Sequence, residues 1–280
     1  MRFSTILGGL AAALAAHPAL GQEAADPPPP VTITGSATVA SDYRYRGVSQ
    51  TDKEMALQAG ISATHESGLY VGTWGSNLAG WGTFGGANIE LDVFAGYKAS
   101  LGGGATLDTG VTYIFYPGGS DETDFFEGYV KLSGTAGPLT LTASAFYAPA
   151  QQALGRVFFT GAAAAAGLPD DPGDREDNLY LAGDAAIAIP STPITAKAHI
   201  GYSDGNAGLG PNGTSLAPTG RYFDWAVGAD VVVSNLTFNV SYVDTDITRA
   251  ESAYLLPNFS KGGVDPIADA SIVVSLTAAF

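Results

Sequence analysis

The chain contains no cysteine, few histidines and little charge. Of its 280 residues, 14% are charged, against about 25% in a typical soluble domain. The absence of cysteine excludes a disulfide framework, a thiolate metal site and a cysteine nucleophile. The three histidines are scattered along the chain, which argues against a histidine-based zinc site. No apolar run reaches the roughly 20 residues that a transmembrane helix needs.

Basic residues are scarcer than acidic ones. The chain has 12 Lys and Arg against 27 Asp and Glu, a formal net charge of −15. Nucleic acid requires a basic face, so no nucleic-acid partner is expected. Aromatic and β-branched residues recur along the chain, which distinguishes it from a disordered segment.

The first residues have the features of a secretory signal peptide. One arginine precedes a short apolar stretch, and Ala19 and Gly21 place small residues before a cleavage site. We therefore predict a signal peptide over 1–21 and, because of four consecutive prolines, a stiff periplasmic linker over 22–30. An exported chain without a spanning helix can cross a membrane only as a closed β-barrel, since every backbone group must be bonded internally.

From residue 31 onward, apolar and polar residues alternate with a period of two, which predicts strands rather than helices. The predicted strands, twelve in all, are 31–46, 53–65, 69–78, 88–98, 105–116, 125–133, 139–147, 178–189, 194–203, 221–233, 236–244 and 270–280. Short and long connections alternate between them, as in a meander barrel with tight turns at one rim. The sequence thus predicts an all-β fold, a transmembrane antiparallel up-and-down β-barrel over 31–280.

The scarcity of charge indicates which face is outside. A soluble barrel needs a solvated exterior, whereas low charge fits an apolar, lipid-facing exterior and a polar lumen. For strand 69–78 the sequence does not decide which residues face outward, because Leu69 and Val71 on one face and Tyr70 and Trp74 on the other are both apolar. Several aromatic residues fall toward the long-loop rim, as in an interfacial girdle. They are Tyr45, Tyr113, Phe115, Phe126, Tyr147, Tyr202, Phe223, Trp225 and Tyr242.

Charged side chains on the polar faces are the candidate pore-lining residues. They are Asp42, Arg44, Arg46, Glu90, Asp92, Lys98, Asp108, Glu127, Lys131, Asp184, Lys197, His199, Asp224 and Asp230. Acids outnumber bases, so an open lumen would have a weak preference for cations. In the alternative, opposite charges pair across a narrow barrel and plug it.

The last residues resemble the terminal assembly signal of bacterial outer-membrane proteins. Ile272, Val274, Leu276 and Phe280 share one face, and the chain ends on an aromatic residue. This resemblance implies the barrel assembly machinery as a partner and the bacterial outer membrane as the location.

Two further segments leave alternatives open. The acidic run from Asp170 to Asp177 lacks calcium-loop spacing, so it is either a solvated loop or a weak divalent-ion site at the lipopolysaccharide surface. The connection 148–177 could fold inward and narrow the pore, or form an outer lid.

His65 and His199 have no evident nucleophile partner in the sequence, so we predict no catalytic residues and no enzyme activity.

Several stretches resemble the TorF-type porins, also described as the Gcw_chp domain. They are SDYRYRGVSQ at 41–50, GLYVGTWGSN at 68–77, ELDVFAGY at 90–97, YIFYPG at 113–118, Asp224-Trp225, and the strand end Asp244-Thr245-Asp246. The resemblance covers nearly the whole chain after the leader, except that 148–177 departs from it. It implies a bacterial outer-membrane β-barrel of the porin kind.

We accordingly predict a Gram-negative outer-membrane porin-like channel for passive diffusion of small hydrophilic solutes or ions, without cofactor or metal. The alternatives are a structural or adhesive barrel with no open pore, and an outer-membrane lipid-hydrolysing enzyme. Expected partners are outer-membrane lipid, lipopolysaccharide and small solutes. Neither the identity of the solute nor the oligomeric state is predicted.

Overall fold

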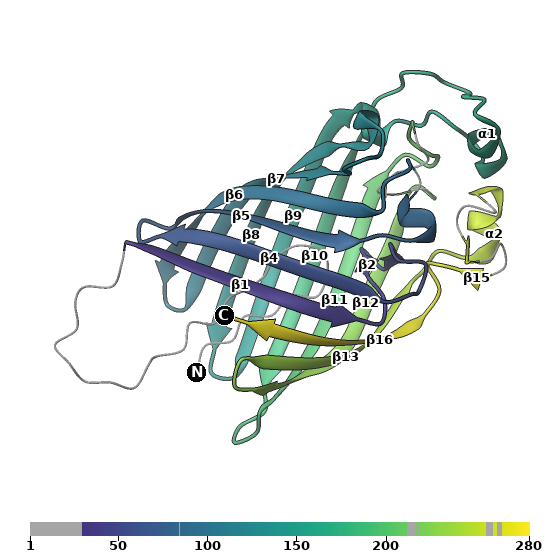
Figure 1. Ribbon diagram of the computed structural model, residues 1–280. Coiled ribbons are helices and arrows are strands. Elements are labelled where there is room, and N and C mark those ends of the chain that lie inside the picture. The colour runs from purple at the N-terminus through teal and green to yellow at the C-terminus, as the bar shows by residue number, and fades with distance from the viewer. Residues whose placement is uncertain (1–29, 84, 212–216, 218, 256–259, 262–264) are drawn as a thin grey trace.

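The computed structural model describes residues 30–83, 85–211, 217, 219–255, 260–261 and 265–280. The predicted signal peptide and all but the last residue of the linker lie outside the described residues. The wall strands are β1 (Val31–Ala40), β4 (Ala56–His65), β5 (Leu69–Asn77), β6 (Ile89–Gly102), β7 (Ala105–Phe115), β8 (Phe125–Ala136), β9 (Leu139–Gln151), β10 (Glu176–Ala188), β11 (Ile194–Gly205), β12 (Tyr222–Val233), β13 (Leu236–Thr245) and β16 (Ser271–Ala279). They form a closed antiparallel barrel of 12 strands (Figure 1), which confirms the predicted fold.

The barrel closes where β1 pairs with β16, in the register Ser36 opposite Ala279 to Ala40 opposite Ser275. The last residue extends this seam, since Phe280 and Gly35 exchange two backbone hydrogen bonds of 3.0 Å. A Cβ at position 35 would lie 2.3–2.9 Å from the ring of Phe280, so the ring would have to move to admit a larger residue. The terminal aromatic residue therefore packs on the seam at the rim of the short turns.

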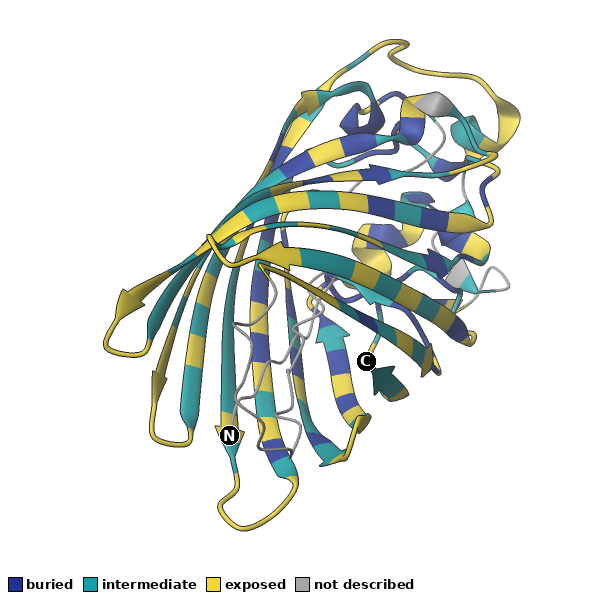
Figure 2. Ribbon diagram, turned by 60° about the vertical axis from the view of Figure 1, so that its left-hand side comes forward, coloured by how far each residue is buried: buried dark blue, intermediate teal, exposed yellow. Residues whose placement is uncertain are grey.

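Exposed and less exposed residues alternate along the wall strands (Figure 2). Val111 is 53% exposed, whereas its neighbour Thr112 is 7% exposed. Leu69 and Val71 also lie on the outer face, which settles the register of β5 and turns Tyr70 and Trp74 inward. The outer face is thus apolar and the interior polar, the reverse of a soluble barrel. No helix among the described residues is long and apolar enough to span a membrane.

Aromatic residues gather on the outer face near the long-loop rim. Tyr113 and Phe126 lie opposite each other, as do Tyr202 and Phe223, whose ring centroids are 4.8 Å apart. Of the predicted girdle, Tyr45 was assigned wrongly, because it belongs to a segment inside the barrel that is described below.

Proline at position 149 in β9 lies near a register shift between Glu176 and Asn178, a bulge that tolerates the lost hydrogen bond.

The long connections carry short elements that pack together at one end of the barrel (Figure 1). These elements are β2 (Arg44–Tyr45), β3 (Val48–Ser49), η1 (Gly80–Thr83), η2 (Asp121–Thr123), η3 (Gln152–Leu154), α1 (Gly161–Ala166), α2 (Arg249–Ser252), η4 (Ala253–Leu255), β14 (Ser260–Lys261) and β15 (Asp265–Pro266). Buried residues of five connections, together with Tyr222, form one hydrophobic cluster, here named the cap cluster. Its members are Val48, Trp81, Val157, Phe158, Leu209, Ala217, Tyr222, Ile247, Leu255, Ile267 and Ala268.

The cap cluster also places the connection 148–177. Phe158 is buried there and exchanges two backbone hydrogen bonds of 3.0 Å with Leu209. Thr160 caps the following short helix α1 by accepting from the amide of Ala163. Helix α1 lies beside α2 at the outer end of the loops (Figure 1). The start of the connection lies inward, since Ala153 and Leu154 pack on the interior-facing Ile114 and Phe125, whereas its middle joins the cap cluster.

Candidate functional site

The first long connection, residues 41–55, folds back into the barrel and is here named the lumen hairpin. Its short strands β2 and β3 pair around Arg46 and Gly47, whose φ angles are 48° and 80°. Two successive positive φ angles are typical of a two-residue hairpin turn and incompatible with a continuous strand. The predicted strand 31–46 was therefore wrong beyond Ala40. Asp42, Arg44 and Arg46 belong to the lumen hairpin and not to the barrel wall.

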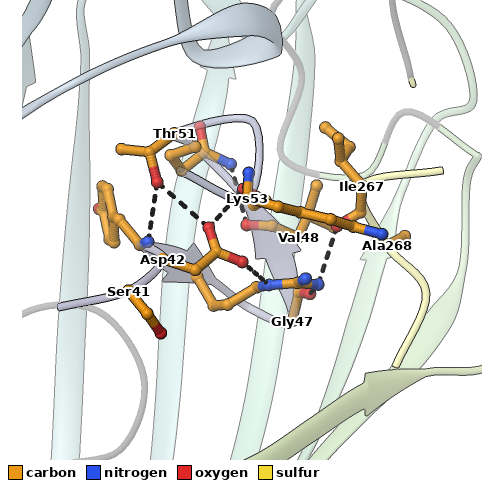
Figure 3. Close-up of polar contacts among 12 residues, drawn as sticks. Ser41, Asp42, Gly47, Val48, Thr51, Lys53, Ile267 and Ala268 are labelled. Carbon is orange, nitrogen blue, oxygen red and sulfur yellow. Dashed lines mark hydrogen bonds and ion pairs between the residues drawn. The ribbon is translucent and has the colours of Figure 1, made fainter. Parts of the chain in front are cut away.

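The carboxylate of Asp42 holds the base of the lumen hairpin together. It accepts hydrogen bonds from Arg44 Nε at 2.5 Å, from Ser49 Oγ at 2.5 Å and from Thr51 Oγ1 at 3.1 Å (Figure 3). Arg44 also donates to the carbonyl of Ile267 at 2.8 Å. Because Asp42 is only 4% exposed, these bonds are shielded from water and fix the hairpin and the last long loop as one unit.

The tip of the lumen hairpin reaches the opposite wall through Arg46. One guanidinium nitrogen donates to Asn178 Oδ1 on β10 at 2.7 Å, and another bonds to Glu127 on β8. The guanidinium also lies over the ring of Tyr180, 4.2 Å from its centroid. The side chains of Arg46 and Glu127 are 4% and 7% exposed, so this ion pair is buried. In addition, Tyr222 on β12 donates to the carbonyl of Arg46.

A second anchor joins the lumen hairpin to β6. The hydroxyl of Tyr43 donates to Glu90 Oε1 at 2.7 Å. Burial and the nearby carboxylates raise the pKa of Tyr43 well above its ordinary value, so the hydroxyl keeps its proton and stays a donor. The hairpin is thus bonded to β6, β8, β10 and β12, and it crosses the lumen at the long-loop end.

Away from the hairpin, charged side chains pair along the wall. His199 lies between Asp184, 2.7 Å from its Nδ1, and Asp224, 3.1 Å from its Nε2. Lys197 pairs with Asp230 at 2.6 Å, and Lys98 with Asp108 at 3.3 Å. These pairs join neighbouring strands and do not bridge the lumen. Among the described residues, the charge pairing across the lumen is that of the hairpin residue Arg46 with Glu127 on β8.

All eleven predicted residues on the wall lie on its interior face. They are Glu90, Asp92, Lys98, Asp108, Glu127, Lys131, Asp184, Lys197, His199, Asp224 and Asp230. Sequence reasoning missed the lumen hairpin. Gly47 was the available signal, because glycine readily adopts the positive φ of a hairpin turn. Sequence reasoning also missed a band of interior aromatic residues.

This aromatic band follows the interior wall from β5 to β10. Its members are Tyr70, Phe94, Tyr129, Phe146 and Tyr180, with successive ring centroids 5.9–6.3 Å apart in the three contacts Tyr70–Phe94, Tyr129–Phe146 and Phe146–Tyr180. Lys131 lies over two of the rings, 4.8 Å from the centroid of Tyr129 and 5.2 Å from that of Phe146. The rings of Tyr70, Tyr129 and Tyr180 lie against glycines of neighbouring strands, where a Cβ would collide with them. Glycine at these positions thus lets the rings lie against the neighbouring strands.

The candidate catalytic and metal groups do not assemble into a centre. Among the described residues, no three His, Asp or Glu side chains are grouped so that they could hold a metal ion. His65 Nδ1 does contact the hydroxyl of Ser67 at 2.8 Å, but it also accepts the backbone amide of Ser67, which makes this a turn contact. In the acidic run, Asp170 and Asp174 accept backbone amides of their own loop, so they stabilise its conformation.

Comparisons with known proteins agree with this fold. Residues 24–280 match a family model described as "Bacterial protein of unknown function (Gcw_chp)". No curated protein matches the sequence. Among solved structures, the NanC porin is 14% identical, with 88% of this chain and 99% of that chain covered and a TM-score of 0.55. The KdgM porin in complex with disordered oligogalacturonate is 9% identical; the match covers 89% of this chain and 98% of that chain, with a TM-score of 0.49. An outer membrane channel from Pseudomonas putida F1 is 9% identical; the match covers 91% of this chain and 98% of that chain, with a TM-score of 0.44.

Proposed function

The chain belongs to the Gcw_chp family of bacterial proteins, and from this premise we propose that it is an outer-membrane porin-like channel for passive diffusion of small hydrophilic solutes or ions. One observation carries the proposal: the closed barrel has an apolar outer face and a charged interior. An apolar exterior of this extent is unfavourable in water and suits the hydrocarbon of a bilayer. The similarity of the fold to the NanC porin and the resemblance of 41–50 to TorF-type porins support the same assignment.

The proposed pathway is a polar lumen narrowed at one end. The candidate pore-lining residues of the wall surround it, and the lumen hairpin crosses it between β6 and β8–β12. Movement of this hairpin would widen the path, since side-chain bonds and not strand pairing join its tip to the wall; backbone bonds join it to other loops, at Ile267 and Ala79. The excess of acids inside favours cations weakly, most of all at low salt, because a Debye length of about 10 Å at 0.1 M screens the field.

Planar-bilayer recording tests the proposal with two variants that each lack six residues and carry two glycines in their place. One variant lacks residues 44–49; its flanking residues Tyr43 and Gln50 share a backbone hydrogen bond of 2.7 Å, so two glycines can close the gap. The control lacks 161–166, helix α1 at the outer end of the loops. We expect small conductance steps from the wild type and the control, and larger steps from the hairpin deletion. A folded hairpin deletion that passes no current would refute a channel.

A barrel without an open pore is the second candidate, because the lumen hairpin and the cap cluster both lie over the same end of the barrel. The wild-type recording separates the two candidates, since a barrel closed by the hairpin and the cap cluster passes no current until the hairpin is removed. We propose no enzyme activity, because among the described residues the side chain of His199 bonds to Asp184, Asp224 and Tyr180, which include no serine, threonine or cysteine nucleophile.

We further propose the bacterial outer membrane as the location, with a cleaved signal peptide over 1–21. Ile272, Val274, Leu276 and Phe280 lie exposed on the outer face of β16, where the barrel assembly machinery could bind them while the seam is still open. Outer-membrane lipid and lipopolysaccharide would contact the remaining outer face.

A further inference from the structure

Asp92 is a buried carboxylate without a partner. It lies on the interior face of β6, is 0% exposed, and neither of its oxygens accepts a hydrogen bond from any residue that the structure describes. Moving a carboxylate out of water costs several kcal/mol unless it is paired and hydrogen-bonded. A native fold that retains such a group calls for a compensating ion, water or proton.

The surroundings of Asp92 add negative charge. Glu90 lies two residues away on the same face, and Glu127 is close enough for its charge to act on Asp92. Arg46 pairs with Glu127, which leaves Glu90 and Asp92 without an ion pair among the described residues. The other groups that interact with Asp92 are the hydroxyls of Tyr43, Tyr45 and Tyr116, which are neutral. If Glu90 and Asp92 are both ionised, they carry a charge of about −2 that no described side chain compensates, in a space closed off from solvent.

We propose that Asp92 and Glu90 bind a divalent cation of the calcium or magnesium class beneath the lumen hairpin. Carboxylate oxygens are the ligands that these hard cations prefer. Side chains two residues apart on one strand face are about 6.6 Å apart at their bases, so both carboxylates can turn toward one ion between them. Since no three acidic side chains are grouped as direct ligands, the ion keeps water in part of its shell, as Mg²⁺ usually does.

The ion would also strengthen the docking of the lumen hairpin. Tyr43 donates to Glu90 and Arg46 bonds to Glu127, so the hairpin packs directly on this acidic cluster. Charge neutralisation under the hairpin removes repulsion among the carboxylates, and the folded protein gains stability by mass action when the ion is present. The proposed site is therefore a structural cation site in the barrel interior.

The test uses the full barrel refolded in detergent, stripped with EDTA and titrated with CaCl₂ or MgCl₂ in a calorimeter. We expect one ion per barrel and a Tm that rises by several degrees with the preferred ion. Asp92→Asn should weaken binding by more than about tenfold and remove the dependence of Tm on the ion. The control Asp230→Asn changes an equally buried interior carboxylate that pairs with Lys197, and it should keep wild-type affinity.

A second measurement keeps the proposal testable if a variant fails to fold. Terbium bound near Tyr43 and Tyr116 should luminesce on excitation of tyrosine in the wild-type barrel, and calcium should displace it. The proposal is overturned if the stripped wild type shows neither heat, Tm shift nor terbium signal, or if Asp92→Asn binds as the wild type does. An infrared spectrum in which Asp92 carries a proton in millimolar calcium would overturn it as well. Because none of these assays needs a membrane current, their failure is distinct from failure of the proposed channel.

Discussion

Replacement of Arg46 by alanine tests whether the lumen hairpin closes the barrel. In the structure this guanidinium bonds to Glu127 and Asn178 and lies over Tyr180, all on the wall opposite the hairpin base. Breaking one partner of a buried ion pair costs about 3–5 kcal/mol, because the remaining charge is left uncompensated. If that cost falls on hairpin docking, the ratio of docked to undocked hairpin drops by roughly 10² to 10⁴.

The assay is single-channel recording, with the fraction of time spent in the larger conductance as the readout. Arg46→Ala should raise that fraction strongly, and Glu127→Gln should raise it in the same direction. The matched control is Arg221→Ala, which removes the same charge from an ion pair with Asp204 whose side chains are 71% and 37% exposed. An exposed pair contributes at most about 1 kcal/mol, so the control should behave as the wild type.

The coupling between the two buried partners refines the same experiment. If Arg46 and Glu127 act through each other, the double variant should open no more than the stronger single variant, because the second change removes a charge already left unpaired. The reasoning is refuted if Arg46→Ala records like Arg221→Ala while the barrel stays folded. In that case the hairpin is held by its base around Asp42 and not by its tip.

Three further predictions concern the wall, the seam and the interior charge. Val111→Arg on the outer face should lower the free energy of unfolding by roughly 2–4 kcal/mol, the cost of an arginine near the bilayer centre. Thr112→Arg, opposite Glu127 in the interior, should lower it by less. Equal losses in urea titrations in lipid vesicles would contradict the lipid-facing assignment. Deletion of Phe280 should lower the amount of protein in the outer membrane of cells but leave the refolded barrel stable in detergent; normal surface levels would rule out an assembly role. With divalent ions removed by EDTA, Glu90→Gln with Asp92→Asn should shift the reversal potential in a KCl gradient toward anions. An unchanged potential would remove these carboxylates from the selectivity argument.

The sequence by itself determined the wall of the barrel. Alternation of side chains is a local property of a strand, so it can be counted residue by residue; along 105–116 the count puts Val111 and Thr112 on opposite faces, as the structure does. The interior position of the eleven wall charges follows from the same count. Strand 69–78 was the exception, because aromatic and aliphatic side chains alternate there; only pairing between β5 and β6, and contacts such as Tyr70 with Asp108, fix its register.

Only the tertiary structure decided what fills the barrel. The segment 41–46 continues the alternating pattern of β1, yet the chain leaves the wall because its polar groups find partners elsewhere. Tyr43 bonds to Glu90 across 47 residues of sequence, and Arg46 bonds to Glu127 across 81 and to Asn178 across 132. Such contacts exist only after the strands have closed into a ring, since closure brings β6, β8 and β10 around one lumen. A local pattern of polarity cannot encode them, and so the wall could be predicted from the sequence whereas the lumen hairpin could not.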